Sequence, residues 1–324
     1  MVRRENLLPV SLRLSITDRC QLHCLYCAPP PDAEELSSPD ILGFEEIIRF
    51  VRVLKARFGL SKVHITGGEP LLRPGIADLV AMVAREKTAD LALTTNGQLL
   101  GAMALDLKRA GLHRVNISLD TLNADTFRWL TRGGELRHTI AGIEAALRCG
   151  LSPVKLNVTV LRSVNTSELV DIARFGLERG CEVRFLELMP IGPAAERFRD
   201  LFVPSAEVLT KLSEAFDLKP APPSSSQSSR NHFAADRQGR EGIIGFISPQ
   251  TAPFCDDCRR LRLTATGQLI GCLARGEGPN VRSFLRNGDS CGGEFLVEAI
   301  ETTLCLKRNA GPFSTREPMA RVGG

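Results

Sequence analysis

The sequence lacks the features that mark membrane-spanning and exported proteins. No stretch is apolar over the about 20 consecutive residues that a bilayer-spanning helix needs. Residues 1–6 contain no apolar segment of the kind that a signal peptide carries. We therefore expect no membrane contact and a cytoplasmic protein, in which a framework of disulfide bonds is uncommon.

A strong excess of charge of either sign is also missing. The chain has 41 Lys and Arg against 37 Asp and Glu, a formal net charge of +4 and a pI near 8.6. This mild excess gives no argument for binding nucleic acid, although it leaves room for a local basic pocket that binds an anion. With 324 residues, 43% of them hydrophobic, the chain is long enough for one large domain and a smaller region.

Cysteine, in contrast, is abundant, and three of the ten cysteines form one compact array. Cys20, Cys24 and Cys27 have the spacing C-x3-C-x2-C, which lets one loop wrap around a single metal centre. Three thiolates are one too few for a closed tetrahedral zinc site or a fully ligated [4Fe–4S] cube. A cube would therefore keep one open iron for a small molecule. A structural zinc site with His23 as the fourth ligand is the alternative for this array alone.

A second array, Cys255, Cys258 and Cys272, has the spacing C-x2-C-x13-C. Residues 259–264 and 268–272 predict a hairpin that returns Cys272 beside the other two cysteines. The spacing leaves structural zinc and an iron–sulfur centre equally open. Four scattered cysteines receive no role: Cys149, Cys181, Cys291 and Cys305.

From residue 10 to about residue 190, strand-like segments alternate with helical ones, which predicts right-handed βα units and a parallel sheet. The predicted strands are 10–16, 62–66, 90–94, 114–119, 153–161 and 182–188. The predicted helices between them are 44–58, 76–87, 102–110, 138–149 and 167–179. We expect an α/β barrel domain over 1–216, with a last helix at 205–216. A Pro/Ser-rich linker over 217–240 and a C-terminal α+β region over 241–324 follow.

One face of the predicted sheet is polar on strand after strand. Because residues i and i+2 of a strand share a face, alternating polar residues line up on one side. Since helices should cover the other face, this pattern predicts a wide polar lumen that holds a polar ligand. An antiparallel sheet with one solvated face is the alternative, and the intervening helices disfavour it. The polar sets are Arg13, Ser15 and Thr17; His64 and Thr66; Thr94 and Asn96; Asn116, Ser118 and Asp120; and Lys155, Asn157 and Thr159.

The C-x3-C-x2-C array, followed by Gly67-Gly68-Glu69-Pro70 after the second predicted strand, resembles the signature of radical S-adenosylmethionine (SAM) enzymes. The resemblance implies a partial (β/α)6 barrel of the radical SAM type. It also implies a [4Fe–4S] cluster on Cys20, Cys24 and Cys27, whose open iron binds SAM. Reduction then cleaves SAM to methionine and a 5'-deoxyadenosyl radical.

Two further motifs narrow the resemblance. Arg260-Leu261-Arg262 lies within the second cysteine array, and the sequence ends in Gly323-Gly324. With the first array, from about Leu12 to Gly324, the chain resembles the GTP 3',8-cyclases, lyases of molybdenum cofactor biosynthesis. The resemblance implies a second [4Fe–4S] cluster, on Cys255, Cys258 and Cys272, that contacts the guanine of GTP. In that family the radical removes hydrogen from ribose C3', and C3' then attacks C8 to give 3',8-cyclo-7,8-dihydro-GTP.

The same resemblance implies roles for individual residues. SAM contacts are expected at Tyr26, Gly68, Ser118 and Met189, and GTP contacts at Arg13, His64, Thr94, Lys155, Arg260 and Arg262. His64 stands where related cyclases carry Arg, so we expect a weaker or altered GTP contact from a histidine that is partly charged at neutral pH. Gly323 and Gly324 are expected to reach the active site and support cyclisation. An electron donor such as flavodoxin or ferredoxin is implied, with a homodimer as one option for the assembly.

Three other interpretations stay open from the sequence. Another radical SAM enzyme with an auxiliary cluster could act on a different substrate, which the Arg260 and Arg262 pair disfavours. A non-enzymatic iron–sulfur carrier would have no use for six polar-faced strands. A zinc-stabilised binding protein would contain zinc in place of iron and sulfide.

Overall fold

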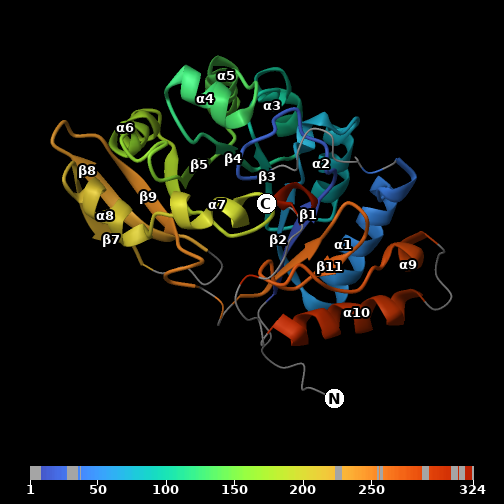
Figure 1. The fold of residues 1–324 in the computed structure, drawn as a ribbon. Helices are drawn as coiled ribbons and strands as arrows, with labels where there is room; N and C mark the ends of the chain where they lie inside the picture. The colour runs from blue at the N-terminus through green and yellow to red at the C-terminus, as the bar shows by residue number, and fades with distance from the viewer. Residues whose placement is uncertain are drawn as a thin grey trace.

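The computed structural model describes residues 9–27, 36, 38–222, 228–253, 255, 258–286, 292–307, 313 and 318–322. Its strands form one eleven-stranded sheet in the order β11-β10-β1-β2-β3-β4-β5-β6-β9-β8-β7. The sheet curls around a central space, and the helices α1 to α6 lie in an arc around its outside (Figure 1). Within the ranges just given, no helix combines the length and the apolar character needed to cross a membrane.

Six parallel strands in sequence order form the centre of the sheet, as predicted. They are β1 (Val10–Ser15), β2 (Leu60–Thr66), β3 (Asp90–Thr95), β4 (Arg114–Ser118), β5 (Val154–Val160) and β6 (Glu182–Glu187). The predicted helices between them are α1 (Phe44–Phe58), α2 (Ile76–Arg85), α3 (Leu100–Arg109), α5 (Leu136–Arg148) and α6 (Leu169–Glu178). The α/β barrel architecture is therefore confirmed.

The helix α4 (Ala124–Thr131) between β4 and α5 was not predicted, because it is short. It begins at Asn123, whose side chain accepts hydrogen bonds from the backbone N–H groups of Asp125 and Thr126. Such an Asn cap satisfies two of the free N–H groups at the start of a helix. This short helix matters because it packs against the first cysteine loop.

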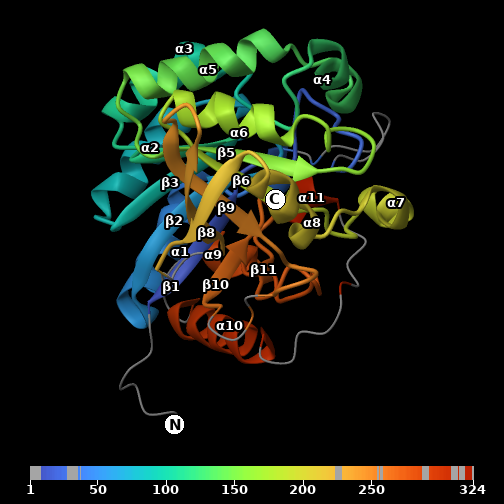
Figure 2. The same cartoon turned by 90° about the vertical axis from the view of Figure 1, so that its left-hand side faces the viewer.

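Strands from the C-terminal part of the chain extend the sheet at both ends. On one side, β10 (Arg260–Leu263) pairs in parallel with β1 and forms the predicted hairpin with β11 (Leu269–Ile270). On the other side, β9 (Glu241–Ile247) pairs in parallel with β6, and β8 (Arg230–Asp236) and β7 (Phe216–Pro220) follow antiparallel. β10, which lies between the cysteines of the second array in the sequence, is thereby placed beside β1 (Figure 2). The remaining helices are α7 (Ala194–Leu201), α8 (Ser205–Ser213), α9 (Arg282–Arg286), α10 (Gly292–Leu306) and α11 (Met319–Val322).

Strands occupy part of the segment predicted as a linker, residues 217–240. Residues 217–220 continue β7, and 230–236 form β8. The predicted helix over 205–216 ends at Ser213, because Phe216 is buried and begins a strand in which exposed Asp217 and Lys219 alternate with Leu218. This alternation is the strand period. Residues 223–227 of the Pro/Ser-rich segment lie outside the described residues. The division of the chain at 216 and 240 stays a prediction.

The two faces of the barrel strands differ as the alternation predicted. Residues such as Ile65, Ile117, Leu156 and Val158 are fully buried in one large apolar core, together with residues of the surrounding helices. The polar residues at alternating positions face the opposite way, into the lumen. The hydrophobic core therefore lies between the sheet and the outer helices, which leaves the inner face for a site.

Candidate functional site

The first cysteine loop follows β1 and is held on two sides. On one side, the N–H groups of His23 and Leu25 donate to the carbonyl oxygens of Thr131 and Leu130, each at 3.0 Å. These acceptors are at the end of α4, where helix carbonyls lack partners within the helix. The loop therefore satisfies the end of α4 while α4 fixes the loop.

On the other side, the loop contacts the Gly-Gly turn after β2. The N–H of Gly68 donates to the carbonyl of Thr17 at 2.8 Å, and the N–H of Glu69 donates to that of Arg19 at 2.7 Å. A Cβ atom on Gly68 would lie 2.4 Å from the carbonyl oxygen of Arg19. Only glycine permits this approach. Gly68, predicted to contact SAM, thus also packs against the loop that carries the cysteines.

The three thiols of this loop are partly buried and lie close to one another. Burial raises the pKa of Cys20 to about 11 and that of Cys27 to about 12. Burial also raises the pKa of Cys24, and the neighbouring Cys27, Asp120 and Cys20 raise it further. Three thiolates here need a strongly cationic partner, which an iron–sulfur cluster provides. The donor set therefore fits a cube with three protein ligands.

Across the described part of the chain, no group of three or more His, Cys, Asp or Glu side chains is arranged to hold a metal ion. Each thiolate that ligates a cube binds a different iron. The geometry of a cube therefore differs from that of a site for one ion.

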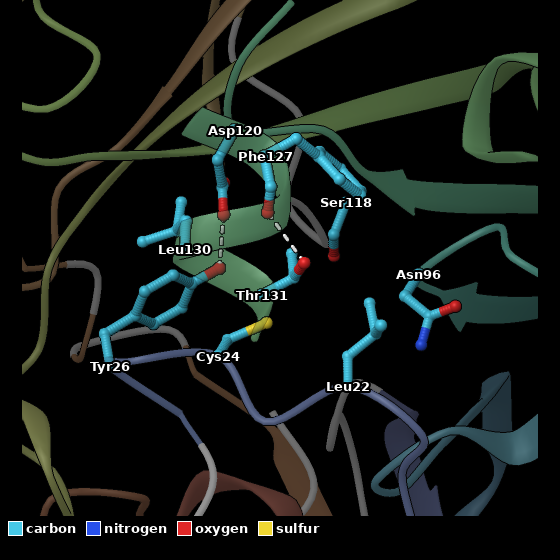
Figure 3. Close-up of a pocket in the computed structure, with 9 residues that line it drawn as sticks. All are labelled: Leu22, Cys24, Tyr26, Asn96, Ser118, Asp120, Phe127, Leu130 and Thr131. Atoms are coloured by element: carbon cyan, nitrogen blue, oxygen red, sulfur yellow. Dashed lines mark hydrogen bonds between the residues drawn. The ribbon is translucent and has the colours of Figure 1, made fainter. Parts of the chain in front are cut away.

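A cavity lies directly beside Cys24 (Figure 3). The Tyr26 hydroxyl donates to Asp120 Oδ2 at 2.5 Å, and Asp120 Oδ1 accepts from the N–H of Thr159 at 2.7 Å. Burial raises the pKa of Asp120 to about 6. Two of the predicted SAM contacts, Tyr26 and Ser118, are brought together here, whereas Gly68 and Met189 are not in the lining. The cavity is lined by Leu22, Cys24, Tyr26, Asn96, Ser118, Asp120, Phe127, Leu130 and Thr131.

Glu69 is a buried carboxyl group next to this cavity. It accepts hydrogen bonds from the N–H groups of Leu71 and Asn96 and from the Thr95 hydroxyl, at 2.8–3.0 Å. Burial raises the pKa of Glu69 to about 7, although these hydrogen bonds favour the charged form. Glu69 therefore ties the Gly-Gly turn to the end of β3.

The second cysteine array has a different electrostatic environment. The N–H of Cys258 donates to the carbonyl of Cys255 at 3.1 Å, and β10 and β11 bring Cys272 back toward them. Burial alone would raise the pKa of Cys258, but nearby Lys307 and Arg260 lower it below its ordinary value. Asp256 and Asp257 lie outside the described residues. The cations near Cys258 therefore favour its thiolate form.

The strand register and the alternation within each strand place all six predicted GTP contacts on one continuous surface. Arg262 pairs with Arg13, and Arg13 pairs with His64. Thr94 pairs with Asn116, which pairs with Lys155. Partners on parallel strands share a face, so these residues line the same wall. Arg260 is two residues from Arg262 on β10 and therefore shares its face.

The sequence predicted a partly charged His64, but in the structure this side chain is neutral. Its Nε2 lies 2.6 Å from Thr94 Oγ1. Burial, followed by the charges of Arg13 and Arg114, lowers its pKa well below 6.5. His64 is therefore neutral near pH 7 and acts through hydrogen bonding.

Sequence reasoning missed five charged residues of this wall. Arg114 donates to both oxygens of Asp90, at 2.9 and 2.8 Å, and Lys62 Nζ lies 3.2 Å from Asp90 Oδ2. Lys155 Nζ donates to Glu182 Oε2 at 2.5 Å, and Arg184 Nη2 lies 3.4 Å from the same oxygen. Arg114 could have been found by extending the alternating pattern of β4 from Asn116 to the preceding residue on the same face. The set is Lys62, Asp90, Arg114, Glu182 and Arg184.

The wall has the properties of an anion site. Burial lowers the pKa of Arg13, and the neighbouring Arg262, Arg260 and Arg114 lower it further. Such crowding of buried cations is unfavourable until an anion binds. In addition, Ser15 Oγ and Asn157 Oδ1 are buried without a hydrogen-bond partner. A ligand that carries both negative charge and hydrogen-bond donors would satisfy both conditions.

The end of the described chain lies inside the molecule. Ala320 and Val322 of α11 are only 4% and 3% exposed. In both views, α11 lies near the middle of the barrel (Figures 1 and 2). Gly323 and Gly324 lie outside the described residues.

Sequence profiles of two families match this chain in succession. The Radical SAM superfamily matches residues 14–176, and the family described as Molybdenum Cofactor Synthesis C matches residues 181–312. A GTP 3',8-cyclase of Geobacter sulfurreducens is 41% identical over 320 residues, which cover 97% of this chain and 96% of the relative. A GTP 3',8-cyclase of Rhodopirellula baltica is 43% identical over 303 residues, covering 93% and 84%.

The fold is similar to solved structures with little sequence identity. Streptococcus suis SuiB bound to S-adenosylmethionine has a TM-score of 0.58 at 16% identity. The match covers 82% of this chain and 61% of that one, so this chain spans less than two thirds of SuiB. At this identity, the likeness supports the fold alone.

Proposed function

This chain belongs to the GTP 3',8-cyclase family of radical SAM enzymes, and from this membership we propose that it converts GTP to 3',8-cyclo-7,8-dihydro-GTP. The reaction is that of a lyase and is the first step of molybdenum cofactor biosynthesis. The observation that carries the proposal is the cationic wall. In this wall Arg262, Arg13 and His64 lie side by side on three neighbouring strands. A triphosphate is the ligand chemistry that such a wall suits.

Two groups of cysteines would hold the cofactors: Cys20, Cys24 and Cys27 one [4Fe–4S] cluster, and Cys255, Cys258 and Cys272 the second. When bound, the first cluster and SAM supply a 5'-deoxyadenosyl radical. The cavity beside Cys24, with Tyr26 and Ser118, would place SAM at this end of the lumen.

The protein itself contributes by positioning the substrate and by excluding water from the site. Arg13, Arg260, Arg262 and Lys155 would anchor the triphosphate through charge-assisted hydrogen bonds. Thr94 and neutral His64 would add uncharged hydrogen bonds next to them. The buried lumen keeps a reactive carbon centre away from bulk water while the base and the ribose are held in one orientation.

The decisive experiment is anaerobic reconstitution of the full chain with iron and sulfide, followed by incubation with SAM, dithionite and GTP. We expect mass spectrometry to detect 3',8-cyclo-7,8-dihydro-GTP together with 5'-deoxyadenosine. Omission of SAM is the control. Formation of 5'-deoxyadenosine with GTP unchanged would contradict the proposed substrate, and absence of iron and sulfide would contradict the whole assignment.

A deletion tests the role proposed for the chain end. The burial of Ala320 and Val322 in α11, near the middle of the barrel, supports a role for this end of the chain. We expect removal of Gly323 and Gly324 to abolish product formation while iron content and SAM cleavage persist. Turnover of the truncated chain at the intact rate would refute this role. The electron donor (a flavodoxin or ferredoxin), the homodimer and the cytoplasmic location stay predictions.

A further inference from the structure

The cationic wall contains two carboxylates, and they are held in different ways. Asp90 accepts hydrogen bonds from Nε and Nη2 of Arg114 and forms an ion pair with Lys62, with contacts of 2.8–3.2 Å. A bidentate Arg–carboxylate pair of this kind is geometrically fixed. Asp90 therefore belongs to the framework of the wall.

Glu182 is attached through one oxygen. Its Oε2 accepts from Lys155 Nζ at 2.5 Å and lies 3.4 Å from Arg184 Nη2. The Lys155 side chain is only 7% exposed, so its ammonium group has little access to water. Without a counter-ion, Lys155 and Arg184 would repel each other at this depth.

We propose that Glu182 is a displaceable counter-ion that occupies the Lys155 and Arg184 cations until the triphosphate takes its place. The proposal deepens the proposed function and rests on it for the identity of GTP. Glu182 is a positioning residue, since it acts through Lys155. In the free protein it pairs with the two cations, and it competes with the phosphate for the same donors. Glu182 thereby weakens ground-state affinity for polyphosphates.

The sign of one substitution tests the proposal. Glu182→Gln keeps the shape and the oxygen acceptor but removes the negative charge. We expect GTP to bind about tenfold more tightly to this variant, because one unit of like charge leaves the vicinity of the phosphates. If Glu182 only orients Lys155, the variant will bind GTP equally well or more weakly, and either result would overturn the proposal.

Binding is measured by anaerobic calorimetry at pH 7 on the reconstituted full chain, without reductant or SAM, so that GTP is not consumed. Inorganic triphosphate should show a similar gain, whereas the affinity for guanosine should not change. A gain for guanosine as large as that for GTP would indicate a reshaped pocket and would contradict the proposal. Iron content and thermal melting of each variant verify that it is folded.

Two matched variants complete the test. Glu182→Asp retains the charge and should keep the affinity for GTP within about twofold of that of the unmodified chain. Glu207→Gln removes a carboxylate that pairs with Arg162 on the surface, and it should change nothing. If the unmodified chain binds triphosphate but not GTP, the proposed substrate fails. The Glu182 inference is then still decided by the triphosphate measurements.

Discussion

The two cysteine arrays have the same number of thiols but opposite electrostatic surroundings. The first lies partly buried beside the carboxyl groups of Glu69 and Asp120, and the pKa values of its thiols are raised. In the second, Lys307 and Arg260 lower the pKa of Cys258. The carboxyl groups suit the ammonium and sulfonium charges of SAM, whereas the basic surroundings suit a triphosphate. The difference indicates that each array is built for a different ligand.

The comparison predicts that loss of the second array leaves SAM cleavage intact, whereas loss of the first array does not. We expect Cys24→Ala to lower both SAM cleavage and product formation by more than about 100-fold, because a ligand matters more than its supporting groups. Cys258→Ala should lower product formation as strongly while SAM cleavage continues. Both products are measured by liquid chromatography after reconstitution. Equal loss of SAM cleavage in the two variants would show that the arrays do not act separately.

A glycine substitution disturbs the first array without changing any ligand. Gly68→Ala places a Cβ atom against the carbonyl oxygens of Asp18 and Arg19, at 2.5 and 2.4 Å. We expect the loop to shift and the activity to fall by about 10- to 100-fold, as for other losses of ligand support. Gly293→Ala, in a helix where a Cβ atom meets nothing within 4 Å, is the matched control. Iron content per chain, measured with activity, should fall only in the first variant.

The lumen should respond to pH through Lys155. Burial and the nearby charge of Arg184 lower the pKa of Lys155 to about 8, although Glu182 acts in the opposite direction. Lys155 is charged below this pH and neutral above it, so GTP affinity should be retained at pH 7 and lost as the pH rises. The loss should reach about tenfold per pH unit above pH 8. In the Lys155→Arg variant, the affinity should stay flat to pH 9, and an equally steep loss there would exclude Lys155 as the origin.

The smallest expected effect concerns His64, the departure from related cyclases. His64→Arg adds a cation next to Thr94 and Arg13, where neutral His64 now donates or accepts one hydrogen bond. We expect a gain in GTP affinity of about three- to tenfold, limited by repulsion from the other arginines. SAM cleavage should not change, since His64 belongs to the basic wall predicted to bind GTP and not to the first cysteine array. An unchanged affinity for GTP would remove His64 from the contact surface.

Much of the fold followed from local patterns in the sequence. Alternation of polar and apolar residues predicted β1 to β6 and their polar face, because the strand period is fixed by backbone geometry. The hairpin of β10 and β11 followed from two short strands around Gly267. The strands β7 and β8 were missed, since a Pro/Ser-rich segment between them dominated the composition of that region.

The candidate site was predicted less completely. The cysteines, Arg13, Lys155 and Arg262 came from motifs and from a resemblance, whereas Glu182 and Asp90 had no motif to mark them. Their importance depends on which strand lies next to which. Register places Glu182 opposite Lys155 on the neighbouring strand. No periodicity within one segment contains that information.

The sequence by itself determined the thiol arrays, the parallel βα core and the polar face of each strand, since these depend on spacing and on side chains near one another in the chain. Only the tertiary structure decided that β10 lies beside β1. That pairing brings Arg262 next to Arg13, over a separation of 249 residues. It also decided that His64 is neutral and Lys155 weakly basic, because both pKa values depend on burial and on charges from other strands.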